Sequence, residues 1–212
     1  STFGYLAGHY LDEIDDPGPG PFRTLGYDAD GRISSITDAN GNVTAVSIDP
    51  DARTEIVTSP DGLLTTVSTF DVRGNAVSID EVYDGASHVQ AFVYDSNDNL
   101  LSRTDPLGNT FSASYDGDDN LTSFTDGEGN TSSFGYDAFG FPTSVTDAAG
   151  ETTTFVYDGL GNLTSSTNPL GEFESFTYDG AGRQLTRTDE LGRTTTWTYD
   201  ANGRVATETD PT

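Results

Sequence analysis

The stretch YDGLGNLTSSTNPLGEFESFT, residues 157–177, is followed at once by a second copy of the same pattern, which begins at Tyr178. A Tyr-Asp pair recurs every 21 residues, at positions 94, 115, 136, 157, 178 and 199. Ten residues after each of these tyrosines stands a threonine followed by Asp or Asn, from Thr104-Asp105 to Thr209-Asp210. A fixed period of this length is typical of stacked repeats, in which each copy covers its neighbour.

Alternation with a period of two identifies strands within each copy. An aromatic residue lies two positions before the tyrosine in most copies: Phe92, Phe134, Phe155, Phe176 and Trp197. Because side chains alternate across a strand, both aromatics face the same side. A second strand, rich in Ser and Thr, follows the Tyr-Asp turn at residues 162–167. With no helical spacing, the chain is predicted to be all-β: tandem 21-residue β-hairpins stacked into a continuous twisted or spiralling antiparallel sheet.

Two turns close each copy. Residues 105–108, Asp-Pro-Leu-Gly, have the composition that a type I turn prefers. Residues 158–162 suit a three-residue loop with Gly161 in the left-handed region, which would place Tyr157 opposite Leu163. Since the 21-residue period is odd, each copy needs one net register break. We therefore expect a β-bulge at one of the two turns and none at the other.

The repeat array is predicted to span residues 27–212, in about nine copies that start at positions 27, 48, 70, 94, 115, 136, 157, 178 and 199. The third copy starts one residue late, and about three residues are inserted before the fourth, within residues 82–88. Residues 1–26 do not follow the pattern, and Asp15–Pro21 are rich in Pro and Gly. We interpret them as an N-terminal cap or arm with a linker, which covers the first sheet edge or reaches a neighbouring molecule.

Composition disfavours two classes of partner. The formal charge is −26, from 35 acidic and 9 basic residues, so nucleic acid and anionic membranes are disfavoured. Cysteine is absent, and no apolar run is long enough to span a membrane. Hydrophobic residues make up only 33% of the chain, but the regular placement of the aromatics argues against disorder. The start Ser1-Thr2-Phe3, without Met or a signal pattern, indicates a mature or excised part of a longer protein.

The pattern Tyr-Asp-x-x-Gly-Asn/Arg-Leu followed by Thr-Asp-x-x-Gly-Asn-Thr resembles the YD-repeat (Rhs-repeat) family. Residues 27–33, 157–163 and 104–110 carry the resemblance, which extends from Tyr27 to the end of the chain. It implies a spiral sheet of consecutive hairpins, which in relatives forms a hollow shell around a toxin polypeptide or a large extracellular barrel. It also implies a secreted or surface-attached protein; some relatives are linked to carbohydrate binding or contact-dependent competition.

The aspartates form two columns that stacking would space by about 10 Å, two strand separations. One column holds Asp95, Asp116, Asp137, Asp158, Asp179 and Asp200, and the other holds Asp105, Asp126, Asp147 and Asp189. Carboxylates near turn carbonyls could bind Ca²⁺. The interpretation that we favour is that each aspartate accepts hydrogen bonds from the amides of its own turn.

Other candidate residues carry weaker signals. His9 and His88 lack the spacing of a metal site or a catalytic triad, so both are expected on the surface. The aromatic row could stack on sugars if it is exposed, although a buried row is favoured. Chance pairs of carboxylates could support glycosidase chemistry, but no pair stands out. Four asparagines match the glycosylation pattern only because they belong to the repeat consensus: Asn42, Asn120, Asn130 and Asn162.

We therefore assign no catalytic, cofactor-binding or metal-binding residue, and we predict no enzyme activity and no cofactor, with structural calcium left open. The main hypothesis is a non-enzymatic extracellular structural module of a cell-surface fibre or large adhesin-like protein, able to self-associate through sheet edges or the N-terminal arm. One alternative is a section of an Rhs-type toxin-encapsulating shell. A second alternative is a carbohydrate-binding module whose partners are glycans. The predicted location is secreted or at the cell surface.

Overall fold

The structure, a computed structural model, describes the backbone of residues 3–5, 11–15 and 21–211, and side chains from residue 23 to residue 211. The described residues form twenty β-strands and no helix, which confirms the all-β prediction. They accordingly contain no helix long and apolar enough to cross a membrane. The chain divides into two compact units, unit 1 (Ser1–Thr110) and unit 2 (Phe111–Thr212), and each is described by itself.

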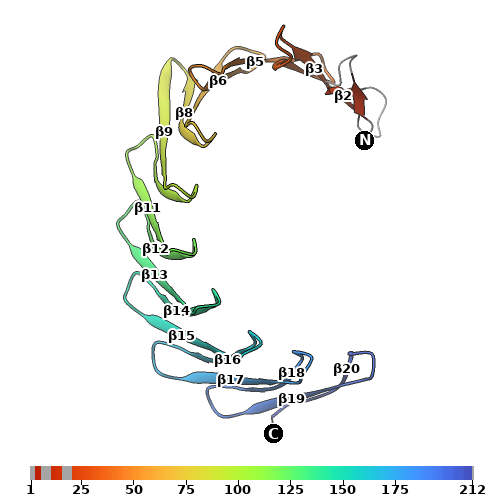
Figure 1. Cartoon of the computed structure of the whole chain (residues 1–212), viewed down its shortest axis with the longest axis vertical. Helices are drawn as coiled ribbons and strands as arrows, with labels where there is room; N and C mark the ends of the chain where they lie inside the picture. Colours follow the sequence, from red (N-terminus) through yellow and green to blue (C-terminus); the bar gives the residue numbers. More distant parts are fainter. Residues whose placement is uncertain (1–2, 6–10, 16–20, 212) are drawn as a thin grey trace. The chain divides into compact units, whose positions relative to one another are not determined.

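The strands of unit 1 are β1 (Phe3–Tyr5), β2 (Leu11–Asp15), β3 (Pro21–Tyr27), β4 (Ile33–Asp38), β5 (Val43–Asp49), β6 (Thr54–Thr58), β7 (Leu64–Phe70), β8 (Ala76–Tyr83), β9 (Ala86–Tyr94) and β10 (Leu100–Thr104). The strands of unit 2 are β11 (Thr110–Tyr115), β12 (Leu121–Thr125), β13 (Thr131–Tyr136), β14 (Pro142–Thr146), β15 (Thr152–Tyr157), β16 (Leu163–Thr167), β17 (Phe173–Tyr178), β18 (Gln184–Thr188), β19 (Thr194–Tyr199) and β20 (Val205–Thr209). Within each unit every strand pairs antiparallel with the next one along the chain, and Figure 1 shows them side by side in that order. Each unit is therefore a succession of hairpins.

The two kinds of turn share one loop geometry. In the Tyr-Asp turn, the Asp158 amide donates to the Asn162 carbonyl at 2.9 Å, and the Gly161 amide donates to the Asp158 carbonyl at 3.1 Å. Gly161 has a φ of 84°, as predicted. The Thr-Asp turn that begins at Asp105 contains the same two bonds, and its Gly108 has a φ of 89°. Only glycine enters this left-handed region without a steric penalty, which explains why glycine holds this position in most turns of both kinds.

The register break lies at the Tyr-Asp hairpins, as the odd period requires. Tyr157 faces Leu163 as predicted, but Val156 faces Ser165, so Thr164 is the extra residue of a β-bulge. The other Tyr-Asp hairpins of unit 2 show the same shift. The Thr-Asp hairpins of unit 2 run without one. Because both turns contain a left-handed glycine, the break comes from the residue after the turn and not from the turn itself.

The hairpin β8–β9 departs from the repeat. Tyr83 pairs with Ala86, so only Asp84 and Gly85 connect the strands, with φ angles of 52° and 73°. Positive φ at both positions is the geometry of a type I′ hairpin turn. The strands have 8 and 9 residues, whereas β10 and β11 on either side of the next Thr-Asp turn have 5 and 6. Longer strands and a shorter loop account for the net insertion, so it is distributed along the β8–β9 hairpin that contains the predicted residues 82–88.

The first strands extend the same pairing. Tyr5 faces Leu11 with a register shift between Gly4 and Tyr5, the arrangement of the Tyr-Asp hairpins. Parts of the predicted cap and linker, residues 1–2, 6–10 and 16–20, lie outside the described residues, and His9 is among them. The boundary between a cap and an array at residue 27 stays a prediction.

The sheet of unit 2 has two chemically distinct faces. The register places Phe134, Phe155, Phe176 and Trp197 on one side, which we call the aromatic face. The opposite side, the hydroxyl face, carries facing pairs such as Ser165 with Ser175 and Thr186 with Thr196. Hydroxyls bond across it, for example Thr177 to Thr186 at 2.7 Å.

The aromatic row is half-buried, whereas a buried row was expected. Among the described side chains only Leu25 is a buried hydrophobic residue, and Phe124 on the aromatic face remains 39% exposed. The reason is that the strands of each unit pair edge to edge, and strand pairing covers backbone groups without covering the faces of the sheet.

Candidate functional site

The polar groups of the chain are concentrated in its turns, and each turn aspartate is satisfied locally. Asp158 accepts hydrogen bonds through Oδ1 from the amides of Leu160 and Asn162, both at 2.9 Å, and through Oδ2 from the Asn162 side chain at 2.9 Å. The same bond from the amide four residues on is made to Asp28, Asp38, Asp71, Asp95, Asp105, Asp116, Asp126, Asp137, Asp147, Asp179, Asp189 and Asp200. The geometry agrees with the favoured interpretation of the aspartate columns.

These bonds favour the charged carboxylates. The Asn162 side chain and amide lower the pKa of Asp158. For Asp71 desolvation acts to raise the pKa, but hydrogen bonds from Asn75 and Arg73 outweigh it and lower the pKa to about 2. Within residues 23–211 no three His, Cys, Asp or Glu side chains are placed to hold a metal ion together. Calcium binding stays a prediction.

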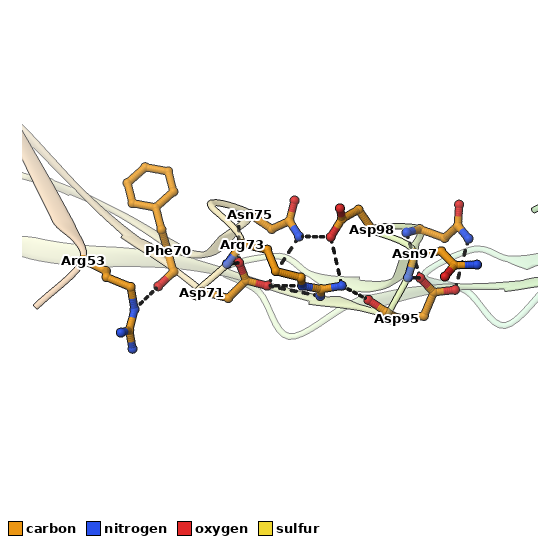
Figure 2. Close-up of polar contacts among 9 residues, drawn as sticks. Arg53, Phe70, Asp71, Arg73, Asn75, Asp95, Asn97 and Asp98 are labelled. Carbon is orange, nitrogen blue, oxygen red and sulfur yellow. Dashed lines mark hydrogen bonds and ion pairs between the residues drawn. The ribbon is translucent and has the colours of Figure 1, made fainter. Parts of the chain in front are cut away.

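A cluster of side chains joins two neighbouring Tyr-Asp turns in unit 1 (Figure 2). The guanidinium of Arg73 lies 3.2 Å from Asp71 Oδ2 in its own turn and 2.9 Å from Asp98 Oδ1 in the next turn, and it also donates to the Asp95 carbonyl. The Asn75 side chain donates to Asp98 Oδ1 at 2.6 Å. Asp98 has a φ of 70°, at the place that glycine holds in most turns. Its carboxylate reaches the preceding turn, which gives a physical reason for an aspartate at a strained position.

A second set of contacts joins consecutive copies through their tyrosines. The hydroxyl of Tyr178 donates to the Leu163 carbonyl at 2.8 Å, and that of Tyr199 donates to the Gln184 carbonyl at 2.7 Å. The last residue of the preceding turn lies against the ring: the Arg183 guanidinium is 4.7 Å from the Tyr199 centroid. We call this turn residue, together with the carbonyl of the residue after it, the tyrosine socket.

In an earlier copy an aromatic ring contacts the tyrosine at the same position of the socket. Phe141 stacks on Tyr157 with ring centroids 5.1 Å apart, so an aromatic replaces the arginine at the socket's turn position. Burial and the nearby Asp137 charge raise the pKa of Tyr157. Burial and the Asp158 charge raise the pKa of Tyr178. The neutral phenols are therefore favoured, which suits their place between copies.

Sequence reasoning identified the tyrosines but missed both cross-copy contacts. A signal for the first was present: Asp98 and Asp119 replace the left-handed glycine in their turns. A signal for the tyrosine sockets was an arginine at the last position of the turn, which occurs at Arg32, Arg183 and Arg204. Neither signal names its partner, because the partners lie in other copies.

The remaining candidates are not brought together into a reactive group. His88 stacks on Tyr83 with centroids 4.0 Å apart, and its Nδ1 lies 3.2 Å from the Glu81 carbonyl. Asp80 accepts a bond from the Ser87 hydroxyl at 2.6 Å and from the His88 amide at 3.0 Å, so the serine bonds the carboxylate and not the imidazole. The amides of the four glycosylation-pattern asparagines donate to their own turn aspartates: Asn42, Asn120, Asn130 and Asn162.

One open depression in unit 2 has a volume of about 370 Å³ and is lined by Glu174, Arg187, Asp189, Glu190, Leu191 and Arg193. Its cations are already paired, Arg187 with Glu174 and Arg193 with Asp189. Asn168 in the neighbouring turn donates to Glu190 at 3.2 Å. Side chains of adjacent copies therefore bond to one another at this depression.

Repeated hairpins, local turn bonding and cross-copy sockets define a tandem β-hairpin repeat protein. The sequence model of the Teneurin YD-shell family matches residues 55–209. The chain belongs to this family, which confirms the resemblance to YD repeats. A search of curated protein sequences gave no match.

Solved structures share the fold at low sequence identity. The crystal structure of TcdB2-TccC3 matches with a TM-score of 0.68 and 16% identity, over 96% of this chain and 12% of that one. TcdB2-TccC3 without its hypervariable C-terminal region matches with a TM-score of 0.59 and 16% identity, over 88% of this chain and 14% of that one. A Tc holotoxin pore from Photorhabdus luminescens matches with a TM-score of 0.57 and 16% identity, over 88% and 14%. The chain thus spans only a small part of the length of these proteins.

Proposed function

We propose that this chain is a section of the wall of a shell-forming YD-repeat protein and that it acts through its structure, without catalysis. The observation that carries the proposal is the YD-shell family match over residues 55–209. This match supports the encapsulating-shell alternative better than the surface fibre that was our main hypothesis.

The contacts between copies suit a wall. Each single hairpin has little apolar area to bury, so its stability depends on its neighbours. The tyrosine sockets and the Arg73 cluster bond one copy to the next at the ends of the strands, where ladder bonding stops. Local bonding of the aspartates leaves the turns charged and hydrated without unsatisfied amides.

The two faces of unit 2 differ as the two sides of a wall would. The half-buried aromatic face offers apolar surface to an enclosed polypeptide, although the Arg187–Glu174 ion pair and Glu208 lie on the same face. The hydroxyl face offers hydrogen bonds to water and also carries the exposed side chains of Val156 and Phe173. We further propose that the protein acts outside the cell or on its surface, where the acidic charge keeps such an array soluble.

Limited proteolysis of the complete polypeptide that contains this chain tests the proposal. We expect another segment of the polypeptide to be protected while the array is folded, and to be cleaved at the urea concentration that unfolds the array. The control is the same segment produced alone, which should be cleaved without urea. If every other segment is cleaved equally fast with the array folded and unfolded, the wall proposal fails.

A further inference from the structure

Two neighbouring Tyr-Asp turns inside unit 2 carry exposed apolar side chains at their tips. Phe139 is 84% exposed and Leu160 is 76% exposed. The two turns are neighbours, because the Phe141 ring at the end of the first stacks on Tyr157, which leads into the second. We call Phe139 and Leu160 the turn-tip pair. Both stand at the third position of the turn, where the other Tyr-Asp turns carry polar residues or alanine: Asp30, Arg73, Asn97, Asp118, Ala181 and Asn202.

The turns do not require these apolar side chains. The third turn residue takes part in the loop through its backbone: the Phe139 amide donates to Asp137 Oδ1 at 2.8 Å, and the Leu160 amide donates to Asp158 Oδ1 at 2.9 Å. Asn202 makes the same bond to its own turn aspartate at 2.8 Å with a polar side chain. Neighbouring exposed apolar side chains that the local structure does not require are typical of an interaction surface.

The chain around the turn-tip pair is acidic. Residues 111–182 contain eight Asp and four Glu, and no Lys, Arg or His. Beside Phe139, the Asp137 carboxylate also has bonding capacity left. Asp158 accepts a bond through Oδ2 from the Asn162 side chain at 2.9 Å, but Phe141, which holds the corresponding position in the Asp137 turn, has no side-chain donor. A cation from another molecule can therefore pair with Asp137 Oδ2.

The spacing of the turn-tip pair suits an α-helix. Successive Tyr-Asp turns are two strand separations apart, which is about 10 Å. Residues seven apart on an α-helix lie about 10.5 Å apart and on the same face. A helix that lies across the strand ends can therefore place two apolar side chains on Phe139 and Leu160, while Lys or Arg beside its apolar stripe faces Asp137.

We propose that the Tyr-Asp turns at residues 137–141 and 158–162 form a docking site for a basic amphipathic helix of another polypeptide. The turn-tip pair packs against the apolar stripe of the helix, and Asp137 accepts hydrogen bonds from its cations. Charge complementarity favours a basic partner and disfavours a second copy of this chain, whose net charge is −26. The inference goes beyond the proposed wall function and does not depend on it, because the site uses the ends of strands and neither face of the sheet.

Fluorescence anisotropy of a labelled peptide, titrated with the full chain, tests the proposal. The probe is a synthetic helix of about 18 residues with leucines along one face and lysines on both flanks. Its control is a scrambled peptide of the same composition. We expect the helix to bind at least about tenfold more tightly than the scrambled peptide, because only the helix presents its leucines together. Binding should weaken as NaCl rises from about 0.01 to 0.15 M, because salt screens the attraction.

Substitutions of the turn-tip pair test the apolar contact. Phe139→Asn and Leu160→Asn should each weaken binding of the helical peptide at least about fivefold, because apolar contact area is lost. Asparagine stands at the same turn position at Asn202, so the loop is retained. Leu170→Asn is the matched control: this leucine is 82% exposed in a Thr-Asp turn at the other end of the strands, and the variant should bind like the parent.

Removal of one carboxylate charge tests the ionic contact. Asp137→Asn should weaken binding at least about fivefold. The turn is retained, because Asn168 in a Thr-Asp turn accepts both amide bonds through its side-chain oxygen. Asp147→Asn is the control, since it removes the same charge from a Thr-Asp turn, and its binding should stay within about twofold of the parent.

Circular dichroism and urea midpoints first establish that each variant is folded. The proposal is overturned if the helical and scrambled peptides bind equally, because acidic charge alone then explains binding. It is also overturned if Leu170→Asn weakens binding as much as Phe139→Asn does. If the parent chain self-associates in sedimentation velocity and Phe139→Asn abolishes that association, the turn-tip pair binds a second copy and the proposed helix is wrong.

Discussion

At the scale of single residues, the aspartate of each turn is the group on which the loop depends. Asp158 accepts three bonds within five residues, and its counterparts repeat that pattern. Such local bonding lets a short polar loop reverse the chain without leaving amides unsatisfied.

Asp158→Ala should lower the free energy of unfolding, because the Leu160 and Asn162 amides lose the acceptor that holds the loop together. The urea midpoint, followed by circular dichroism, measures the effect. Asp118→Ala is the control: Asp118 is an exposed residue inside a turn, and its change should stay within about 0.5 kcal/mol. Equal effects of the two changes would contradict the role of the turn aspartate.

Gly161→Ala should destabilise more than Gly171→Ala. Both glycines are left-handed, with φ angles of 84° and 83°, so each change costs about 1–2 kcal/mol in backbone strain. A Cβ at Gly161 would lie 2.5 Å from Phe141 Cζ, whereas nothing lies within 4 Å at Gly171. The overlap should add about 1–3 kcal/mol, measured by urea unfolding. Similar losses at both sites would show that the Phe141 ring moves freely.

Acid should remove the stabilisation that the turn carboxylates provide. The pKa of Asp71 is about 2 against a usual 3.8, so the folded state favours the charged form. A depressed folded pKa gives stability that is present above pH 3.8 and is lost as the pH falls towards 2. The stability difference between the parent and Asp71→Asn should therefore shrink over this window in urea titrations. A difference that stays constant from pH 5 to pH 2, roughly the range over which aspartates titrate, would contradict the assignment.

At the scale of elements, the hairpin is the repeated unit, and the contacts between neighbouring hairpins distinguish one copy from another. The bulge at Thr164 returns the following strand to the correct face, so that an odd repeat keeps its aromatics on one side. The Arg73 cluster and the tyrosine sockets then connect the ends of adjacent hairpins.

Arg73 and Asp98 should show a favourable coupling of about 0.5–1 kcal/mol, the usual range for a partly exposed ion pair. A double-mutant cycle with Arg73→Ala and Asp98→Gly measures it. Asp98→Gly should be more favourable in the Arg73→Ala background, because the left-handed aspartate then keeps its strain without its main partner. Arg73→Ala combined with Asp118→Ala should be additive and serves as the control; zero coupling in the first pair would contradict the bridge.

At the scale of the whole molecule, stability should depend on the number of copies. Shortened chains that end at residues 191, 170 and 149 should melt at progressively lower temperatures, because each lost hairpin also removes one interface. The isolated peptide of residues 157–177 should show no strand signal in circular dichroism. Calorimetry of the series provides the measurement. An unchanged melting temperature throughout would mean that the copies fold independently.

Whether a feature of the fold could be predicted from the sequence depends on how far apart in the chain the interacting residues lie. Strand positions, turn chemistry, the facing of Tyr157 and Leu163 and the existence of one bulge in each copy of unit 2 were predictable, because each depends on residues within one period. The copy that starts at Ile48 has no bulge. The aspartate columns were interpreted correctly for the same reason, since Asp158 bonds residues at most four positions away. The place of the bulge beyond the turn was not predictable, because both turns share one glycine geometry.

By itself the sequence determined that this protein is a row of equivalent hairpins with charged, self-satisfied turns, since a period and a turn signature are local properties of the chain. Only the tertiary structure decided that Tyr178 reaches the Leu163 carbonyl, that Arg73 reaches Asp98 and that the aromatic row stays half-exposed. These contacts join different copies. Their existence depends on the twist and register between strands, which no single copy of the repeat encodes.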